Sequence, residues 1–421
     1  MKKITELMIL TMEKLTSDDL IQLEDKHGAH NYHPLPVVLS KGEGVYVWDV
    51  EGKQYYDFLS AYSAVNQGHC HPKIIGAMIE QAQTLTLTSR AFFNDTLGVY
   101  EKYVTDYFGF DKVLPMNTGA EAVETAIKLC RKWAYEKRGI SENEATIVVC
   151  EGNFHGRTTT IVSFSNDEDA RKSFGPFTPG FVSIPYNDLE TLENVLKQGN
   201  IAGFLVEPIQ GEAGVYVPSE GFLSGAKTLC EKYNALFIAD EVQTGIARTG
   251  RLLAVNHENV QPDILILGKA ISGGVYPVSA VLANDSIMSV IKPGQHGSTF
   301  GGNPIAAKVA MAALEVVKDE NLAENAQLLG VLFRKEMQRI IDNTDLITAV
   351  RGKGLLNAII INDTPESKTA WNLCVELKNN GLLAKPTHGN IIRFAPPLVM
   401  TEEQLMECVA IIEKTITEFK K

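Results

Sequence analysis

Five short apolar runs constrain the fold more than any other feature of this sequence. They are continuous rather than alternating in hydrophobicity, helical stretches separate them, and they occupy residues 112–116, 146–150, 203–206, 235–239 and 263–267. Continuous hydrophobicity is typical of strands buried on both faces, as in a mostly parallel sheet covered by helices. Between the first two runs, Ala122, Ala126 and Cys130 recur at helical spacing. The sequence therefore predicts an α/β layered lobe.

Other segments flank this lobe. Aromatic and β-branched residues on either side of Glu51-Gly52 predict a hairpin within residues 43–59. A long helical segment is expected at about 306–341, followed by a mixture of strands and helices up to residue 421. Because a single core stops growing near ~250–300 residues, we expect this remainder to form a smaller α+β lobe.

Ionisable and polar side chains follow the apolar runs at the points where the predicted strands end. They are Asn117 to Ala120, residues 153–157, Glu207, Asp240 with Glu241, and Lys269. Open parallel sheets bind ligands outside the carboxyl ends of their strands. We therefore expect groups of both charges to converge on one sheet edge.

Lys269 and Asp240 are the most informative of these residues. A lysine between an apolar run and small residues is partly desolvated, which lowers its pKa and makes its amine a nucleophile. A carboxylate at the end of a buried strand needs a partner, and a protonated pyridine nitrogen would be one. The alternatives are a surface lysine at a strand end for Lys269, and a structural ion pair or helix cap for Asp240.

Residues 117–122 lead from a strand into a helix, and backbone amides at a helix start attract phosphate. Any strand-to-helix turn can have this pattern, and the Walker spacing is absent. Arg157 and Arg393 could each bind a carboxylate with two hydrogen bonds, and Glu212 is a possible internal counter-ion, although ordinary surface pairs are the alternative. His69 and His71 have no suitably spaced third ligand, so we favour a turn there and expect no metal.

Net charge and cysteine content narrow the possible binding partners and the cellular compartment. A net charge of −12 disfavours nucleic acid and anionic membranes, and the six cysteines have no CxxC spacing, which favours a reducing compartment. The apolar run at residues 7–10 is too short for a signal peptide, and no run approaches the ~18 residues of a membrane span. We therefore expect a cytoplasmic protein.

Taken together, these residues resemble the class III (ω-amino acid) aminotransferases, from about residue 25 to the end. The most specific parts are residues 236–250, 263–274 and 297–304. The resemblance implies the aspartate-aminotransferase fold (fold type I), with a mostly parallel seven-stranded sheet in the large domain and a smaller α+β domain. It also implies the division 1–62 (N-terminal segment with the hairpin, packing with the small domain), 63–315 (cofactor-binding domain) and 316–421 (small domain).

The resemblance implies pyridoxal 5'-phosphate as cofactor and gives several residues a role toward it. Lys269 would bond the cofactor covalently and shuttle the proton, while Asp240 would pair with the pyridine nitrogen. Gln243 would meet the ring hydroxyl, and Val242 and Phe154 would pack on opposite faces of the ring.

The phosphate would be bound by Gly119 and Ala120 through their backbone amides and by Thr299 from a neighbouring subunit. The resemblance thus implies a homodimer or higher oligomer with shared active sites. The chain departs from relatives at His155, where some have tryptophan, and at Phe300, where tyrosine also occurs.

Within the family, residues 30–36, 62–69, 88–92 and 381–389 are most similar to the members that act on ornithine. This resemblance implies that Arg157 binds a substrate carboxylate. Glu212 would mask Arg393 while ornithine is bound and release it for glutamate or 2-oxoglutarate. Tyr32 and Tyr62 would hold the α-end of ornithine, with Tyr62 selecting against 4-aminobutyrate. The product, glutamate semialdehyde, would cyclise to pyrroline-5-carboxylate, in proline and arginine metabolism.

Two alternatives remain open. Other members of the family act on acetylornithine or 4-aminobutyrate or are aminomutases, and the tyrosines at positions 32 and 62 separate them from the ornithine branch. A catalytically silent binding or scaffold protein could keep the fold, although intact Lys269 and Asp240 argue against it.

Overall fold

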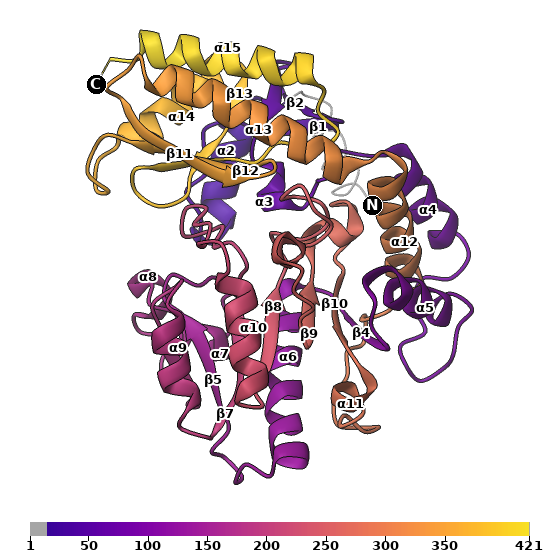
Figure 1. Cartoon of the computed structure of the whole chain (residues 1–421). Coiled ribbons are helices and arrows are strands. Elements are labelled where there is room, and N and C mark those ends of the chain that lie inside the picture. The colour runs from indigo at the N-terminus through magenta and orange to yellow at the C-terminus, as the bar shows by residue number, and fades with distance from the viewer. Residues whose placement is uncertain (1–14, 421) are drawn as a thin grey trace.

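The computed structural model describes residues 15–420 of the 421. The apolar run at residues 7–10, discussed above as a possible signal peptide, lies outside the described residues. The described chain has a large layered part below and a smaller part above it in Figure 1.

A seven-stranded sheet forms the centre of the large part. In sheet order its strands are β4 (Lys112–Met116), β10 (Ser279–Ala283), β9 (Ile264–Leu267), β8 (Leu236–Asp240), β7 (Ile201–Val206), β5 (Thr146–Cys150) and β6 (Phe181–Ile184). Only β10 runs against its neighbours, β4 and β9. The expected mostly parallel seven-stranded sheet is therefore confirmed.

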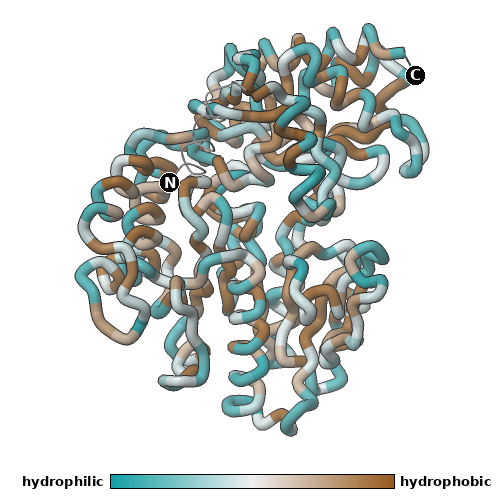
Figure 2. The backbone as a smooth tube through the Cα atoms, turned by 180° about the vertical axis from the view of Figure 1, so that it is seen from behind, coloured by the Kyte–Doolittle hydropathy of each residue, from teal (hydrophilic) through white to brown (hydrophobic). Residues whose placement is uncertain are grey.

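The strands are apolar throughout because both sheet faces are covered. Leu265 and Leu267 of β9 belong to one core cluster, whereas Ile264 and Ile266 belong to the cluster on the other face. Figure 2 shows the hydrophobic segments running through the interior of the molecule, with helices of alternating character around them. The main covering helices are α4 (Pro72–Ala82), α5 (Leu97–Phe108), α6 (Gly119–Trp133), α9 (Leu189–Leu196), α10 (Phe222–Lys232) and α12 (Pro304–Asp319).

Shorter helical elements connect these layers. They are α3 (Ser60–Ser63), η1 (Ala134–Arg138), α7 (Thr159–Val162), α8 (Glu168–Arg171), η2 (Ala254–Glu258), η3 (Lys269–Ser272) and α11 (Asp285–Met288), while the 11-residue helix α2 (Ser17–His27) precedes the first strand. The α3 turn is unusual because Ser60, Ala61, Tyr62 and Ser63 all have left-handed φ angles, from 47° to 71°. The Asp57 carboxylate accepts hydrogen bonds from the Leu59 and Ser60 amides at the start of this turn.

The upper part contains two four-stranded sheets. One has β1 (Leu39–Glu43), β2 (Tyr46–Asp49), β3 (Gln54–Asp57) and β13 (Leu382–Leu383); the other has β11 (Ile347–Lys353), β12 (Leu356–Ile361), β15 (Ile391–Phe394) and β14 (Lys385–Pro386). They pack with α13 (Leu322–Ile341), α14 (Thr369–Asn379) and α15 (Glu402–Glu418), which lie at the top of Figure 1. Parallel pairing of β13 with β3 joins the two ends of the chain.

The hairpin expected within residues 43–59 is present as β2 and β3. The helix expected at 306–341 is instead two helices, α12 and α13, because Asn321 between them has a left-handed φ of 52°. Among residues 15–420, no helix combines the length and the hydrophobicity that crossing a bilayer demands.

Candidate active site

The carboxyl edge of the central sheet gathers the charged residues that the sequence places at strand ends. Asp240 ends β8, Lys269 follows β9 after one residue, and Glu207 follows β7 directly. Arg393 of β15 and Glu212 approach the same place from above, and the charges of all four residues act on the Lys269 amine. The expected convergence of both charge signs is therefore observed.

Lys269 stands at the start of η3 with a left-handed φ of 47°. Burial, followed by the positive charge of Arg393, lowers the pKa of the Lys269 amine to about 8. A lysine in this state is a usable nucleophile near neutral pH, because a larger fraction of its amine is unprotonated than at the ordinary lysine pKa.

Asp240 has a partner that the sequence did not predict. Its Oδ2 lies 2.6 Å from Nδ1 of His155, which follows β5, and its Oδ1 accepts a hydrogen bond from the Val242 amide. Burial alone would lower the pKa of His155, but the hydrogen bond and the charge of Asp240 hold it above its ordinary value. His155 therefore gives the buried Asp240 carboxylate a hydrogen-bonded charge partner.

Glu207 is a second carboxylate for which the sequence suggested no role. It is buried and accepts a hydrogen bond of 2.8 Å from the Phe154 amide, which fixes the backbone beside His155. Burial raises the pKa of Glu207 to about 7. The one feature of the sequence that could have pointed to Glu207 as a site residue was its position directly after an apolar strand.

Two glycines and Val242 form a narrow cradle beside Lys269. A Cβ on Gly119 would lie 2.9 Å from a Val242 methyl group, and one on Gly268 would lie 3.1 Å from the same methyl. Gly119 and Ala120 begin α6, which follows the end of β4, and the amides of a first helical turn have no partner within the helix. A flat ring with a phosphate fits these residues, since the cradle offers an apolar face, a helix start and a buried carboxylate.

Arg393 is almost fully buried and is paired with Glu212, whose Oε2 lies 3.0 Å from the guanidinium. Its Nε has no hydrogen-bond partner, and the Tyr62 ring lies 5.0 Å from the guanidinium carbon. Burial would raise the pKa of Glu212, but the charge and hydrogen bond of Arg393 hold it below its ordinary value. Gln243 extends toward the same guanidinium, 3.5 Å away.

Three of the predicted residues share one cavity. Phe154, Arg157 and Glu212 line a cavity of about 860 Å³. Arg157 is mostly exposed, stacks near the Phe154 ring at 5.6 Å and lies 3.7 Å from Asp167. The structure therefore does not bring Arg157 into the Lys269 cluster.

Tyr32 is 73% exposed, but it lies close enough to Tyr62 to contribute to raising that residue's pKa, after burial and Glu212. Thr299 is exposed on a loop whose preceding residue, Ser298, binds Asn117 at 2.9 Å. His69 and His71 pair with Asp57 and Glu320. Within the described residues, no group of three potential ligands could hold a metal ion.

Comparison with known proteins agrees with this arrangement. The model of the class-III aminotransferase family matches residues 27–416. Ornithine aminotransferase, mitochondrial, from Rattus norvegicus is 60% identical, over 96% of this chain and 91% of the relative.

Two solved structures are also similar. The ornithine aminotransferase of Toxoplasma gondii, reported with pyridoxal phosphate at its active site, has a TM-score of 0.96 and 48% identity, covering 98% of this chain and 97% of that one. The acetylornithine aminotransferase of Elizabethkingia anophelis has a TM-score of 0.89 and 69% identity, covering 96% and 100%.

The cytoplasmic location expected from the sequence is contradicted by these relatives. The Rattus norvegicus protein and others from Drosophila and Caenorhabditis elegans are named as mitochondrial, which does not fit the expected cytoplasmic location. Acidic charge and unpaired cysteines suit any reducing compartment, so composition could not distinguish the two.

The family match covers most of the chain, and the lysine, the buried carboxylate and the start of α6 occupy one sheet edge. The chain therefore belongs to the class-III aminotransferases, which are pyridoxal-phosphate enzymes.

Proposed function

We propose that this enzyme transfers the terminal amino group of ornithine to 2-oxoglutarate. The products are glutamate and glutamate semialdehyde, which cyclises to pyrroline-5-carboxylate and connects arginine with proline metabolism. The ornithine aminotransferases among its relatives support this substrate. The observation that carries the proposal is the buried pair of Arg393 and Glu212, because it allows one site to accept two differently shaped substrates.

Pyridoxal phosphate, when bound, supplies an aldehyde and an electron-accepting ring. Lys269 would hold the cofactor through its amine and would then carry the proton to and from the substrate carbon. Asp240, held by His155, keeps the ring nitrogen protonated. Val242 and Phe154 cover the two faces of the ring.

Three further groups orient the cofactor. Gln243 binds the ring hydroxyl, and the Gly119 and Ala120 amides bind the phosphate at the start of α6. Thr299 reaches the phosphate of a neighbouring subunit, so the enzyme works as a homodimer or a higher oligomer. The exposure of Thr299 and of Phe300, which is 51% exposed, supports this assembly.

Substrate choice depends on the charge of Arg393. While Glu212 neutralises it, the site does not attract the α-carboxylate of ornithine, and the terminal amine of ornithine enters the position beside Lys269 where the cofactor aldehyde would be held. Tyr62 and Tyr32 then hold the α-end. When Glu212 turns away, Arg393 binds the α-carboxylate of 2-oxoglutarate, and Arg157 binds its other carboxylate.

The division into residues 1–62, 63–315 and 316–421 belongs to the same proposal. The pairing of β3 with β13 supports the packing of the first segment with the last. The catalytic groups come from the middle segment, except for Arg393 and the two tyrosines.

Acetylornithine is the second candidate substrate, because the Elizabethkingia anophelis structure is an acetylornithine aminotransferase and is 69% identical. Acetylation removes the α-ammonium charge and adds an acyl group at the end of the substrate that Tyr62 and Tyr32 hold. We expect ornithine to be preferred over N-acetylornithine in kcat/KM by about tenfold or more.

The test is incubation with 2-oxoglutarate and equal concentrations of ornithine, N-acetylornithine or 4-aminobutyrate. Pyrroline-5-carboxylate is trapped with an aromatic aldehyde reagent, and glutamate is measured for all three donors. Lys269→Ala is the negative control, with Lys308→Ala on the exposed face of α12 as its matched control. Faster glutamate formation from N-acetylornithine than from ornithine would refute the proposed substrate.

A further inference from the structure

Gln67 is a buried polar residue that the proposed chemistry does not use. Its side chain is 1% exposed, and its Nε2 donates two hydrogen bonds, to the Ala270 carbonyl at 2.9 Å and to the Ala313 carbonyl at 3.2 Å. An amide nitrogen has two hydrogens, so both donors are used. Gln67 therefore joins the residue after Lys269 to the middle of α12.

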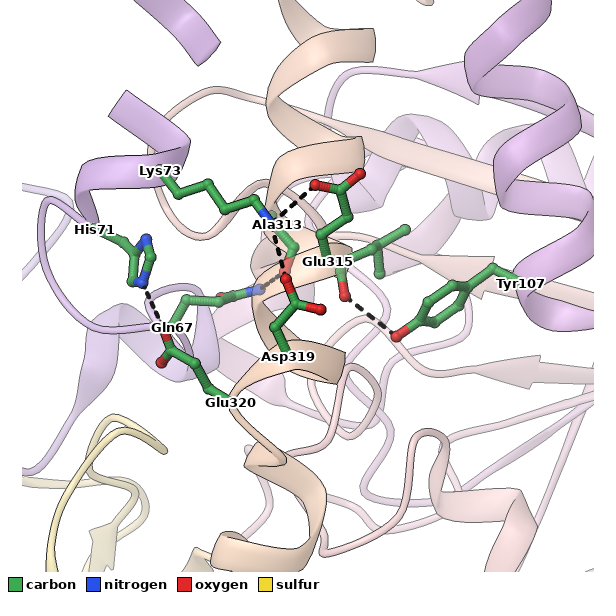
Figure 3. A network of polar contacts seen from close by, with 9 residues as sticks. Gln67, His71, Lys73, Tyr107, Ala313, Glu315, Asp319 and Glu320 are labelled. Carbon is green, nitrogen blue, oxygen red and sulfur yellow. Dashed lines mark hydrogen bonds and ion pairs between the residues drawn. The ribbon is translucent and has the colours of Figure 1, made fainter. Parts of the chain in front are cut away.

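Helix α12 is itself fixed on the side shown in Figure 3. Lys73, at the start of α4, pairs with Glu315 at 3.0 Å and Asp319 at 2.9 Å, and His71 pairs with Glu320 at 2.8 Å. Gln67 lies in the same view with its amide directed at Ala313. Helix α12, to which Gln67 links η3, is thus held in place by several ion pairs.

The turn at Lys269 requires support from a neighbouring element that is itself fixed. Lys269 has a left-handed φ of 47°, a conformation that a residue with a side chain keeps only when its surroundings enforce it. The following glycines leave no room for movement toward residues 65–74, since a Cβ on Gly273 would lie 2.5 Å from an Ile74 methyl and one on Gly274 2.3 Å from a Val65 methyl. Packing supports the turn from this direction, and Gln67 adds a hydrogen bond to the Ala270 carbonyl besides the turn's own hydrogen bonds.

The Oε1 of Gln67 is buried without a hydrogen-bond partner. An unpaired buried oxygen is unfavourable, and an apolar side chain of the same length would avoid it. The reverse amide orientation would place Oε1 against two carbonyl oxygens, so the hydrogen-bond network fixes the orientation. The two donor bonds are the reason for a glutamine at this position.

We propose that Gln67 is a positioning residue for Lys269, holding η3 in place so that Lys269 keeps its left-handed conformation and its amine stays desolvated and aimed at the cofactor. This inference rests on the proposed role of Lys269. It adds a residue from the segment before α4 to the groups that control the lysine.

The test uses the cofactor-free protein and measures how fast acetic anhydride modifies Lys269 at each pH, by mass spectrometry. Gln67→Met keeps the length of the side chain and removes both donors. We expect the midpoint of Lys269 modification to move upward by about half a pH unit or more, since a relaxed turn is better hydrated. In the cofactor-loaded enzyme, turnover should fall by about tenfold or more.

Gln67→Glu is the conservative variant, because a protonated carboxyl still donates one hydrogen bond whereas an ionised one repels both carbonyls. Its turnover relative to the unmodified enzyme should be highest at low pH and fall as the pH rises. This variant also keeps the proposal testable if Gln67→Met does not fold.

Gln81→Met is the matched control. Gln81 is also a buried glutamine, but its Nε2 donates to Leu85 at the end of α4, away from Lys269. An unchanged Lys269 midpoint in Gln67→Met, or an equal shift in Gln81→Met, would overturn the proposal. The modification assay contains no ornithine, so a wrong substrate assignment would leave its result unaffected.

Discussion

Lys269 shows how a single residue is prepared for chemistry by opposing influences. Burial and Arg393 disfavour its charged form, whereas the carboxylates of Glu212, Asp240 and Glu207 favour it. The first two prevail, and the pKa falls from 10.5 to about 8. The amine is therefore reactive near neutral pH without leaving the interior.

This balance predicts how cofactor capture depends on pH. Below a pH of about 8 the Lys269 amine is mostly protonated and cannot attack an aldehyde, and above it the amine is free. The rate at which cofactor-free protein bonds pyridoxal phosphate should rise with pH and level off above about 8, measured by stopped-flow absorbance. Glu212→Gln should move the midpoint lower, because it removes a negative charge that raises the lysine pKa. A midpoint near 10.5 in the unmodified protein would contradict the prediction.

Tyr62 is the residue at which we expect substrate choice to change. Tyr62→Ile removes the hydroxyl that would hold the α-end of ornithine and leaves an apolar surface that suits 4-aminobutyrate. Activity with ornithine should fall by about tenfold or more while activity with 4-aminobutyrate rises, measured as kcat/KM for both donors. Unchanged relative rates would exclude Tyr62 as the selector. Tyr103→Ile, on α5, is a control for the loss of a half-buried tyrosine.

At the scale of elements, the buried strands were predictable because their apolar runs report burial on both faces. The run at 235–239 matches β8 to within one residue, and Asp240 and Lys269 could be placed at strand ends. Strand direction could not be predicted from residues alone, since hydrophobicity shows whether a strand is buried but not in which direction it runs. The strand β10 was not predicted at all. The contact of His155 with Asp240 joins residues 85 positions apart and depends on the order of β5, β7 and β8 in the sheet.

Helix α13 approaches the β11–β12 turn so closely that only glycine fits between them. A Cβ on Gly330 would lie 1.9 Å from the carbonyl oxygen of Gly354. This oxygen belongs to the backbone, so it cannot move away as the end of a flexible side chain could. Gly330→Ala should therefore destabilise the protein by about 3 kcal/mol or more. Gly76→Ala, inside α4 where a Cβ meets nothing within 4 Å, should stabilise it by up to about 1 kcal/mol. Urea unfolding of both variants tests the pair, and equal midpoints would refute the close approach.

At the scale of the whole molecule, the proposed sharing of sites can be tested by mixing two inactive variants. Lys269→Ala lacks the amine, and Thr299→Asp places a negative charge against the phosphate. If Thr299 acts across the interface, a hybrid dimer has one intact site, and random re-association should restore about a quarter of the activity. Failure to recover activity, with hybrid dimers shown by mass spectrometry, would place Thr299 in its own subunit's site.

The pairing of β3 with β13 has a consequence for synthesis on the ribosome. Tyr56 and Asp57 lie beside Leu382 and Leu383, and Asp57 anchors the left-handed turn that presents Tyr62. The strand that borders this anchor is translated more than 300 residues after it, so the nascent chain must carry an unfinished sheet edge through most of elongation. The central sheet can fold during translation, but the turn that carries Tyr62 becomes secure only after residue 383 has emerged from the exit tunnel.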